Sequence, residues 1–102
     1  MSRIRLPNRR PAERIGFTFR GLAYSVGFSR LPDGSLGEVF IDCSKGSSAL
    51  ADDARDAAVT LSIALQCGTP AQAIREAVTR EADGAPAGIV GAVLDLLQEV
   101  RT

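Results

Sequence analysis

The residues in this sequence that could do chemistry are few and widely spaced. The chain has no histidine, which is the commonest general base and metal ligand in proteins. Its two cysteines, Cys43 and Cys67, flank a predicted helix instead of forming a CxxC pair. Cys67 falls near the end of that helix, where the helix dipole disfavours a thiolate. We therefore expect both cysteines to be free thiols with ordinary packing roles, Cys43 as a buried one, and we identify no catalytic residue.

Two charged features around the start of this predicted helix invite an ion-binding interpretation. Residues 45–48, Lys-Gly-Ser-Ser, precede the helix, and N-terminal helix amides attract phosphate. The Gly-Lys-Ser/Thr order of a phosphate-binding loop is missing, however, and Asp52, Asp53 and Asp56 would repel an anion. A capping turn is the favoured interpretation. Asp52 and Asp56 lie one helical turn apart, but no third ligand is evident, so we expect a solvated helix face and no metal site.

A short run of one predicted strand has the composition of a contact surface. Glu38, Phe40 and Asp42 alternate along it and so share one face of the strand. Charged residues on a strand face normally meet solvent or a partner, and an exposed aromatic between two carboxylates favours a partner. We therefore predict that Glu38, Phe40 and Asp42 belong to a partner-binding surface.

The N-terminal residues 1–13 form a predicted basic arm. Residues 1–30 hold seven arginines and one glutamate, a balance of 7 − 1 = +6, although the whole chain has no net charge. The prolines in the arm and its lack of apolar periodicity predict an extended segment without structure of its own. Arginine is suited to bidentate contact with carboxylate or phosphate, so Arg5, Arg9 and Arg10 are candidate partner-binding residues.

Nucleic acid is an alternative partner for this arm, because arginines neutralise phosphates. The arm lacks interleaved aromatic residues, and residues 31–102 carry five basic against eleven acidic residues. A protein partner is therefore favoured over nucleic acid.

Three strands are predicted ahead of the helices. Apolar residues alternate with small or polar ones over residues 14–20 and again over residues 22–29, and Pro32 and Gly34 mark the following turn. A third strand is expected over residues 36–43. On it Val39, Ile41 and Cys43 share the buried face, and Leu36 is assigned to the opposite face with the contact-surface residues.

The remainder of the chain has helical periodicity. One helix is expected to start after residue 48 and to stop at Gly68, a shorter one opens at Pro70, and a third runs over about 86–100. Ser62 is predicted to lie off the apolar stripe of the first helix, which comprises Leu50, Ala54, Ala57, Ala58, Leu61, Ala64 and Leu65. The order β-β-β-α-α-α predicts an α+β domain over residues 14–102, with a three-stranded antiparallel sheet covered by helices on one face.

The sequence also sets expectations about location. No apolar run approaches the roughly 20 residues that a membrane-spanning helix requires. The N-terminus is basic but lacks the apolar stretch of a secretory signal. We therefore expect a cytoplasmic protein without a membrane partner.

Three stretches of the chain are similar to a known family in order and spacing. They are residues 5–10 (RLPNRR), residues 33–42 (DGSLGEVFID) and residues 61–70 (LSIALQCGTP). Together they resemble the TSCPD domain, the region that follows the catalytic barrel in adenosylcobalamin-dependent ribonucleotide reductases. The resemblance covers nearly the whole chain. It implies a bacterial or phage protein linked to deoxyribonucleotide synthesis.

The resemblance does not extend to the chemistry of that family. The family needs a large barrel, a radical cysteine and a C-terminal CxxC pair, which 102 residues with two distant cysteines cannot supply. Cobalamin belongs to that barrel, so no cofactor is expected here. Because the chain begins with Met1, we expect a free-standing accessory or regulatory binding domain, not catalytic alone, whose partner is the reductase, another protein or a second copy. A small nucleic-acid-binding module that uses the arginine arm is the alternative.

Overall fold

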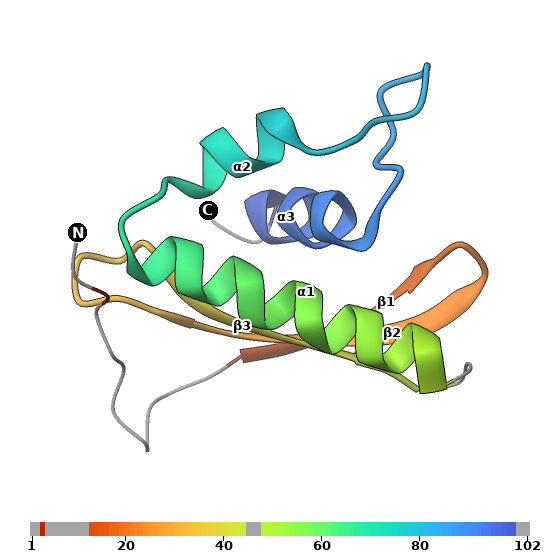
Figure 1. Ribbon diagram of the computed structural model, residues 1–102, viewed down its shortest axis with the longest axis horizontal. Helices are drawn as coiled ribbons and strands as arrows, with labels where there is room; N and C mark the ends of the chain where they lie inside the picture. The colour runs from red at the N-terminus through yellow and green to blue at the C-terminus, as the bar shows by residue number, and fades with distance from the viewer. Residues whose placement is uncertain (1–2, 4–12, 45–47, 100–102) are drawn as a thin grey trace.

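The computed structural model describes Arg3, residues 13–44 and residues 48–99 (Figure 1). The elements follow the predicted order and confirm the α+β class. They are β1 (Glu13–Phe19), β2 (Leu22–Arg30), β3 (Leu36–Cys43), α1 (Ser48–Gln66), α2 (Ala71–Ala77) and α3 (Ile89–Glu99).

The strands form one antiparallel sheet in the order β1-β2-β3, so β2 is central. The β1–β2 connection is a tight turn in which Arg20 (φ 52°) and Gly21 (φ 76°) both have left-handed backbone conformations. Two consecutive residues with positive φ are typical of the two-residue hairpin turn whose twist matches that of the flanking strands. In the β2–β3 turn, Asp33 accepts a hydrogen bond from the Ser35 amide at 2.9 Å, which closes the turn.

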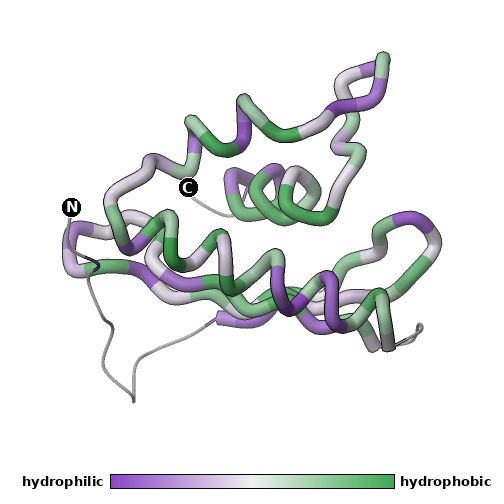
Figure 2. The backbone as a smooth tube through the Cα atoms, viewed as in Figure 1, coloured by the Kyte–Doolittle hydropathy of each residue, from purple (hydrophilic) through white to green (hydrophobic). Residues whose placement is uncertain are grey.

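The core lies between one face of the sheet and the helices. Figure 1 shows the helices on one side of the sheet, as predicted, and it shows α1 lying along β3. Figure 2 shows that α3 is largely apolar, and it supplies Val93, Leu94 and Leu97 to the core. The core residues from the sheet and α1 are Tyr24, Val26, Phe28, Val39, Ile41, Ala54, Ala58, Leu61 and Leu65.

A β-bulge at the start of β3 corrects one assignment. The register shifts so that Arg30 pairs with Leu36 while the preceding pair involves Glu38, which leaves Gly37 as an extra residue. Leu36 consequently packs against the core instead of sharing a face with Glu38. A Cβ on Gly37 would lie 2.7 Å from Cγ of Leu31, so only glycine fits this position without movement of its neighbour.

The packed face of α1 also differs from its prediction at Leu50 and Ser62. The stripe begins at Ala54, one turn into the helix, and Leu50 in the first turn is 40% exposed. Ser62, which was predicted to lie off the stripe, is only 6% exposed, and Gln66 is also buried.

Cys43 is half-buried instead of buried, because it stands at the end of β3. No helix in the described ranges is both long and apolar enough to cross a bilayer.

Candidate protein-interaction surface

Side chains of α1 bind the outer backbone edge of β3. The Ser62 hydroxyl accepts a hydrogen bond from the Val39 amide at 2.9 Å and donates one to the Val39 carbonyl at 3.0 Å. The Gln66 side-chain amide donates to the Gly37 carbonyl at 2.9 Å. Helix α1 therefore satisfies groups that a neighbouring strand would otherwise pair, and this explains why two polar residues are tolerated in buried positions.

One residue of the predicted arm is described, and it lies at this junction. Nε of Arg3 donates a hydrogen bond to Oε1 of Gln66 at 2.5 Å. Arg5, Arg9 and Arg10 fall outside the described residues, so their role in partner binding stays a prediction.

A cleft of about 290 Å³ follows the junction of β3 and α1. Phe40 (42% exposed) and Val59 (53% exposed) present apolar surface around it. The structure thus brings the predicted contact residues of β3 together with a face of α1. The cleft is lined by Arg3, Arg14, Glu38, Val39, Phe40, Ile41, Asp42, Arg55, Ala58, Val59 and Ser62.

An ion pair crosses the outer face of the sheet at this cleft. One guanidinium nitrogen of Arg14 on β1 lies 3.2 Å from Oδ2 of Asp42 on β3 and 3.2 Å from the Ser25 hydroxyl between them. A Cβ on Gly27 would stand 3.7 Å from Arg14 and 3.8 Å from Phe40, so a larger side chain on β2 would crowd this path. Sequence reasoning missed Arg14, because only the sheet register aligns it with the β3 residues.

The acidic start of α1 forms surface contacts. Arg55 lies 3.2 Å from Asp52 in an exposed i,i+3 ion pair. Within the described residues, no three histidine, cysteine, aspartate or glutamate side chains gather closely enough to hold a metal ion. The predicted capping turn falls on residues 45–48, of which 45–47 lie outside the described residues.

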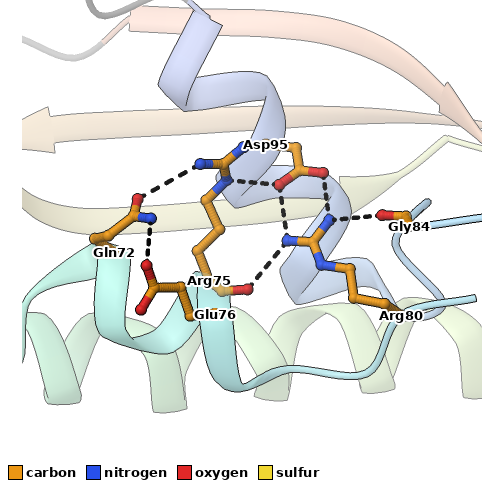
Figure 3. Close-up of polar contacts among 6 residues, drawn as sticks. All are labelled: Gln72, Arg75, Glu76, Arg80, Gly84 and Asp95. Carbon is orange, nitrogen blue, oxygen red and sulfur yellow. Dashed lines mark hydrogen bonds and ion pairs between the residues drawn. The ribbon is translucent and has the colours of Figure 1, made fainter.

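A cluster of partly buried charged side chains joins α2, α3 and the loop between them (Figure 3). Asp95 accepts two hydrogen bonds from Arg80, at 2.6 and 2.9 Å, and one from Nε of Arg75 at 2.7 Å. Arg80 also donates to the Arg75 carbonyl at 3.0 Å and to the Gly84 carbonyl at 3.4 Å. The arginines reach Asp95 from positions 15 and 20 residues away, so sequence spacing gave no signal of this cluster.

The ion pairs of this cluster stabilise the charged forms of Asp95 and Arg80. Hydrogen bonds from Arg80, and then from Arg75, lower the pKa of Asp95 to about 2 against the opposing effect of burial. The same contact with Asp95 raises the pKa of Arg80. Asp95 therefore stays ionised at neutral pH and holds the 78–88 loop and α3 together instead of exchanging protons.

Cys43 and Cys67 do not form a disulfide, as predicted, and both are half-buried. Burial, followed by the neighbouring Cys43, raises the pKa of Tyr24, which keeps the phenol neutral. Tyr24 belongs to the core, and Cys43 packs against it.

A second cleft, of about 520 Å³, lies between α1, α2 and α3. Its walls are mostly aliphatic, from Ala57, Leu61, Ile74 and Val78 among others, and Asp53 stands among the residues that line it. It lacks the aromatic and the arginine residues that distinguish the β3–α1 cleft. We therefore take the β3–α1 cleft as the candidate site.

Comparison with known proteins gives the chain a relationship to one class of enzyme. A 68-residue stretch, 67% of the chain, is 38% identical to vitamin B12-dependent ribonucleotide reductases of Streptantibioticus cattleyicolor, Streptomyces clavuligerus and Streptomyces coelicolor. The stretch covers 11% of the first enzyme and 7% of the other two. No family model matches the chain, and no solved structure matches it significantly. Two thirds of this chain are therefore homologous to a small segment of vitamin B12-dependent ribonucleotide reductases.

Proposed function

We propose that this chain is a TSCPD-like accessory or regulatory domain that binds a ribonucleotide reductase and takes part in deoxyribonucleotide synthesis without being catalytic alone. The homology carries this proposal, since the shared stretch is only 7–11% of each reductase and is 38% identical to it. A separate chain with the sequence of a small reductase segment can occupy the place of that segment against the rest of the enzyme. It then acts in trans, by competing with the segment or by supplementing it.

The β3–α1 cleft is the part of the domain that makes this contact. Aromatic and arginine side chains are enriched in protein interfaces, and here Phe40, Arg14 and Arg55 line the same cleft. Exposed ion pairs such as Arg14–Asp42 contribute only about 0–1 kcal/mol to stability, so their substitution leaves the fold intact. Phe40 supplies the apolar anchor and the charges around it supply the specificity.

The experiment measures binding to the purified ribonucleotide reductase of the organism that encodes this chain, by biolayer interferometry at physiological salt. We expect saturable binding that weakens about tenfold or more in Phe40→Ala, as for a central interface aromatic. Leu50→Ala is the matched control, because Leu50 has nearly the same exposure as Phe40 and lies outside the cleft. This control should bind like the unmodified chain.

Several results would overturn the proposal. If no binding is detected at about 100 μM, the reductase is not the partner. If Phe40→Ala binds as tightly as the unmodified chain, the β3–α1 cleft is not the binding site. If Ala57→Glu loses binding instead, the second cleft is the binding site. Tight binding to single- or double-stranded DNA, with a steep salt dependence, would favour the nucleic-acid alternative.

A further inference from the structure

Strand β1 has one backbone edge that faces away from the sheet. The amide of Ser44 binds the carbonyl of Ala23, so the backbone groups of Ala23 point toward β3. By the alternation of an antiparallel ladder, Leu22 and Tyr24 point toward β1 and meet Phe19 and Phe17. The intervening residues of β1 therefore direct their N–H and C=O groups to the outer edge. They are Arg14, Gly16 and Thr18.

These outer groups have no hydrogen-bond partner among the described residues, since β1 is terminal in the sheet and pairs only with β2. The opposite edge of the sheet is treated differently, because α1 covers β3 through Ser62 and Gln66. An uncovered strand of seven residues is a template for pairing with another strand.

The apolar face of the sheet is also incomplete at β1. Three apolar side chains of β1 pack against the core but are only half-buried: Ile15, Phe17 and Phe19. Their neighbours on β2, Val26 and Tyr24, are buried. Hydrophobic side chains at the rim of a sheet gain burial when another strand extends that sheet. The backbone edge and the side-chain face of β1 therefore both favour an added strand.

We propose that this strand is β1 of a second copy of the chain, paired antiparallel about a two-fold axis at Gly16, which joins two three-stranded sheets into one of six strands. The dyad sets Ile15 opposite Phe17 of the other copy, an aliphatic–aromatic pair on the core face. Each hydrogen-bonded pair exchanges two bonds, and these pairs are Arg14 with Thr18 on both sides and Gly16 with Gly16.

The charge pattern along β1 favours this occupant in this orientation. In the antiparallel register Glu13 stands opposite Phe19, and Arg14 opposite Thr18, so no like charges face each other. Parallel pairing would place Glu13 on Glu13 and Arg14 on Arg14. A two-fold dimer needs a self-complementary patch, and β1 is one.

The test uses charge at the dyad. A side chain at Gly16 has room, since the nearest atom to its Cβ is the Tyr24 carbonyl oxygen at 3.9 Å. We expect Gly16→Lys and Gly16→Glu each to be monomeric, because the two-fold axis places like charges opposite each other. An equal mixture of the two should regain the dimer, since lysine then faces glutamate. Gly88→Lys is the control, at a glycine outside β1 with open space around its Cβ, and should behave as the unmodified chain.

Sedimentation velocity gives the molecular mass of each species. Strand-pairing interfaces are small, and contacts below about 1,200 Å² are weak, so protein concentrations of about 10–500 μM are used. Circular dichroism and thermal unfolding verify that each variant folds. The proposal is overturned if the unmodified chain is monomeric throughout, if either Gly16 variant stays dimeric, or if the mixture does not reassociate. Protection of β1 only in complex with a reductase would likewise assign the edge to that partner and overturn the second copy.

Discussion

The hydroxyl of Ser62 is expected to hold α1 against β3. Ser62→Ala removes both hydrogen bonds to the Val39 backbone and leaves a buried amide and carbonyl without that partner. An unsatisfied buried polar group costs about 1–3 kcal/mol. Alanine has a higher helix propensity than serine, which offsets up to roughly 0.5 kcal/mol of this loss. The expected net destabilisation is therefore about 0.5–3 kcal/mol, which lowers the melting temperature of a domain of this size by roughly 2–24 °C, at about 4–8 °C per kcal/mol.

The assay is urea and thermal unfolding followed by circular dichroism. Thr60→Ala is the matched control, because it also removes a hydroxyl from α1, but an exposed one that donates a hydrogen bond to the Asp56 carbonyl of the same helix at 2.9 Å. Thr60→Ala should change the unfolding free energy by less than about 0.5 kcal/mol, as surface substitutions usually do. If the Ser62 and Thr60 variants are equally stable, the hydroxyl does not satisfy the β3 edge and the reasoning fails.

Three further changes are predicted to alter stability. Leu61→Ala should cost about 2–5 kcal/mol in chemical unfolding, because Leu61 is 3% exposed in the core. Gly37→Ala should cost about 1–3 kcal/mol, because its Cβ would overlap Leu31, and Gly88→Ala, with open space, should not. Asp95 has its pKa lowered from an ordinary value near 3.8 to about 2, so its contribution is present above about pH 4 and lost as pH falls toward 2. Asp95→Asn should cost roughly 1–2 kcal/mol at pH 7, after allowance for its partial exposure, and should flatten the decline of melting temperature between pH 4 and pH 2. A parallel decline in both proteins would show that the Arg80 contact does not stabilise the fold.

The elements of the fold could be predicted because each has a strong local signal. Alternation sets the strands, Gly34 sets the turn between the last two, and helical spacing from Ala54 to Leu65 sets the packed side of α1. The bulge at Gly37 was not predicted, because it depends on how β3 pairs with β2 and on the close approach of Gly37 to Leu31 across the turn. Leu36 was assigned to the wrong face for that reason.

The candidate surface could be predicted only in part. Glu38, Phe40 and Asp42 lie two residues apart, so strand geometry alone places them on one face. Arg14 joins them through the register of three strands, and Arg55 and Val59 through the packing of α1 on β3. Ser62 and Gln66 appear in the sequence as polar residues on a helix, and their roles depend on backbone groups 23 and 29 residues away. Such long-range contacts leave no trace in local spacing.

Hydrogen exchange of the chain, alone and with the ribonucleotide reductase from the same organism, shows directly whether the β3–α1 cleft binds that enzyme. We expect slower amide exchange in residues 38–42 and 55–59, where the cleft lies, with little change in the 78–88 loop. Unchanged exchange at saturating reductase, or protection confined to α2 and the 78–88 loop, would contradict it.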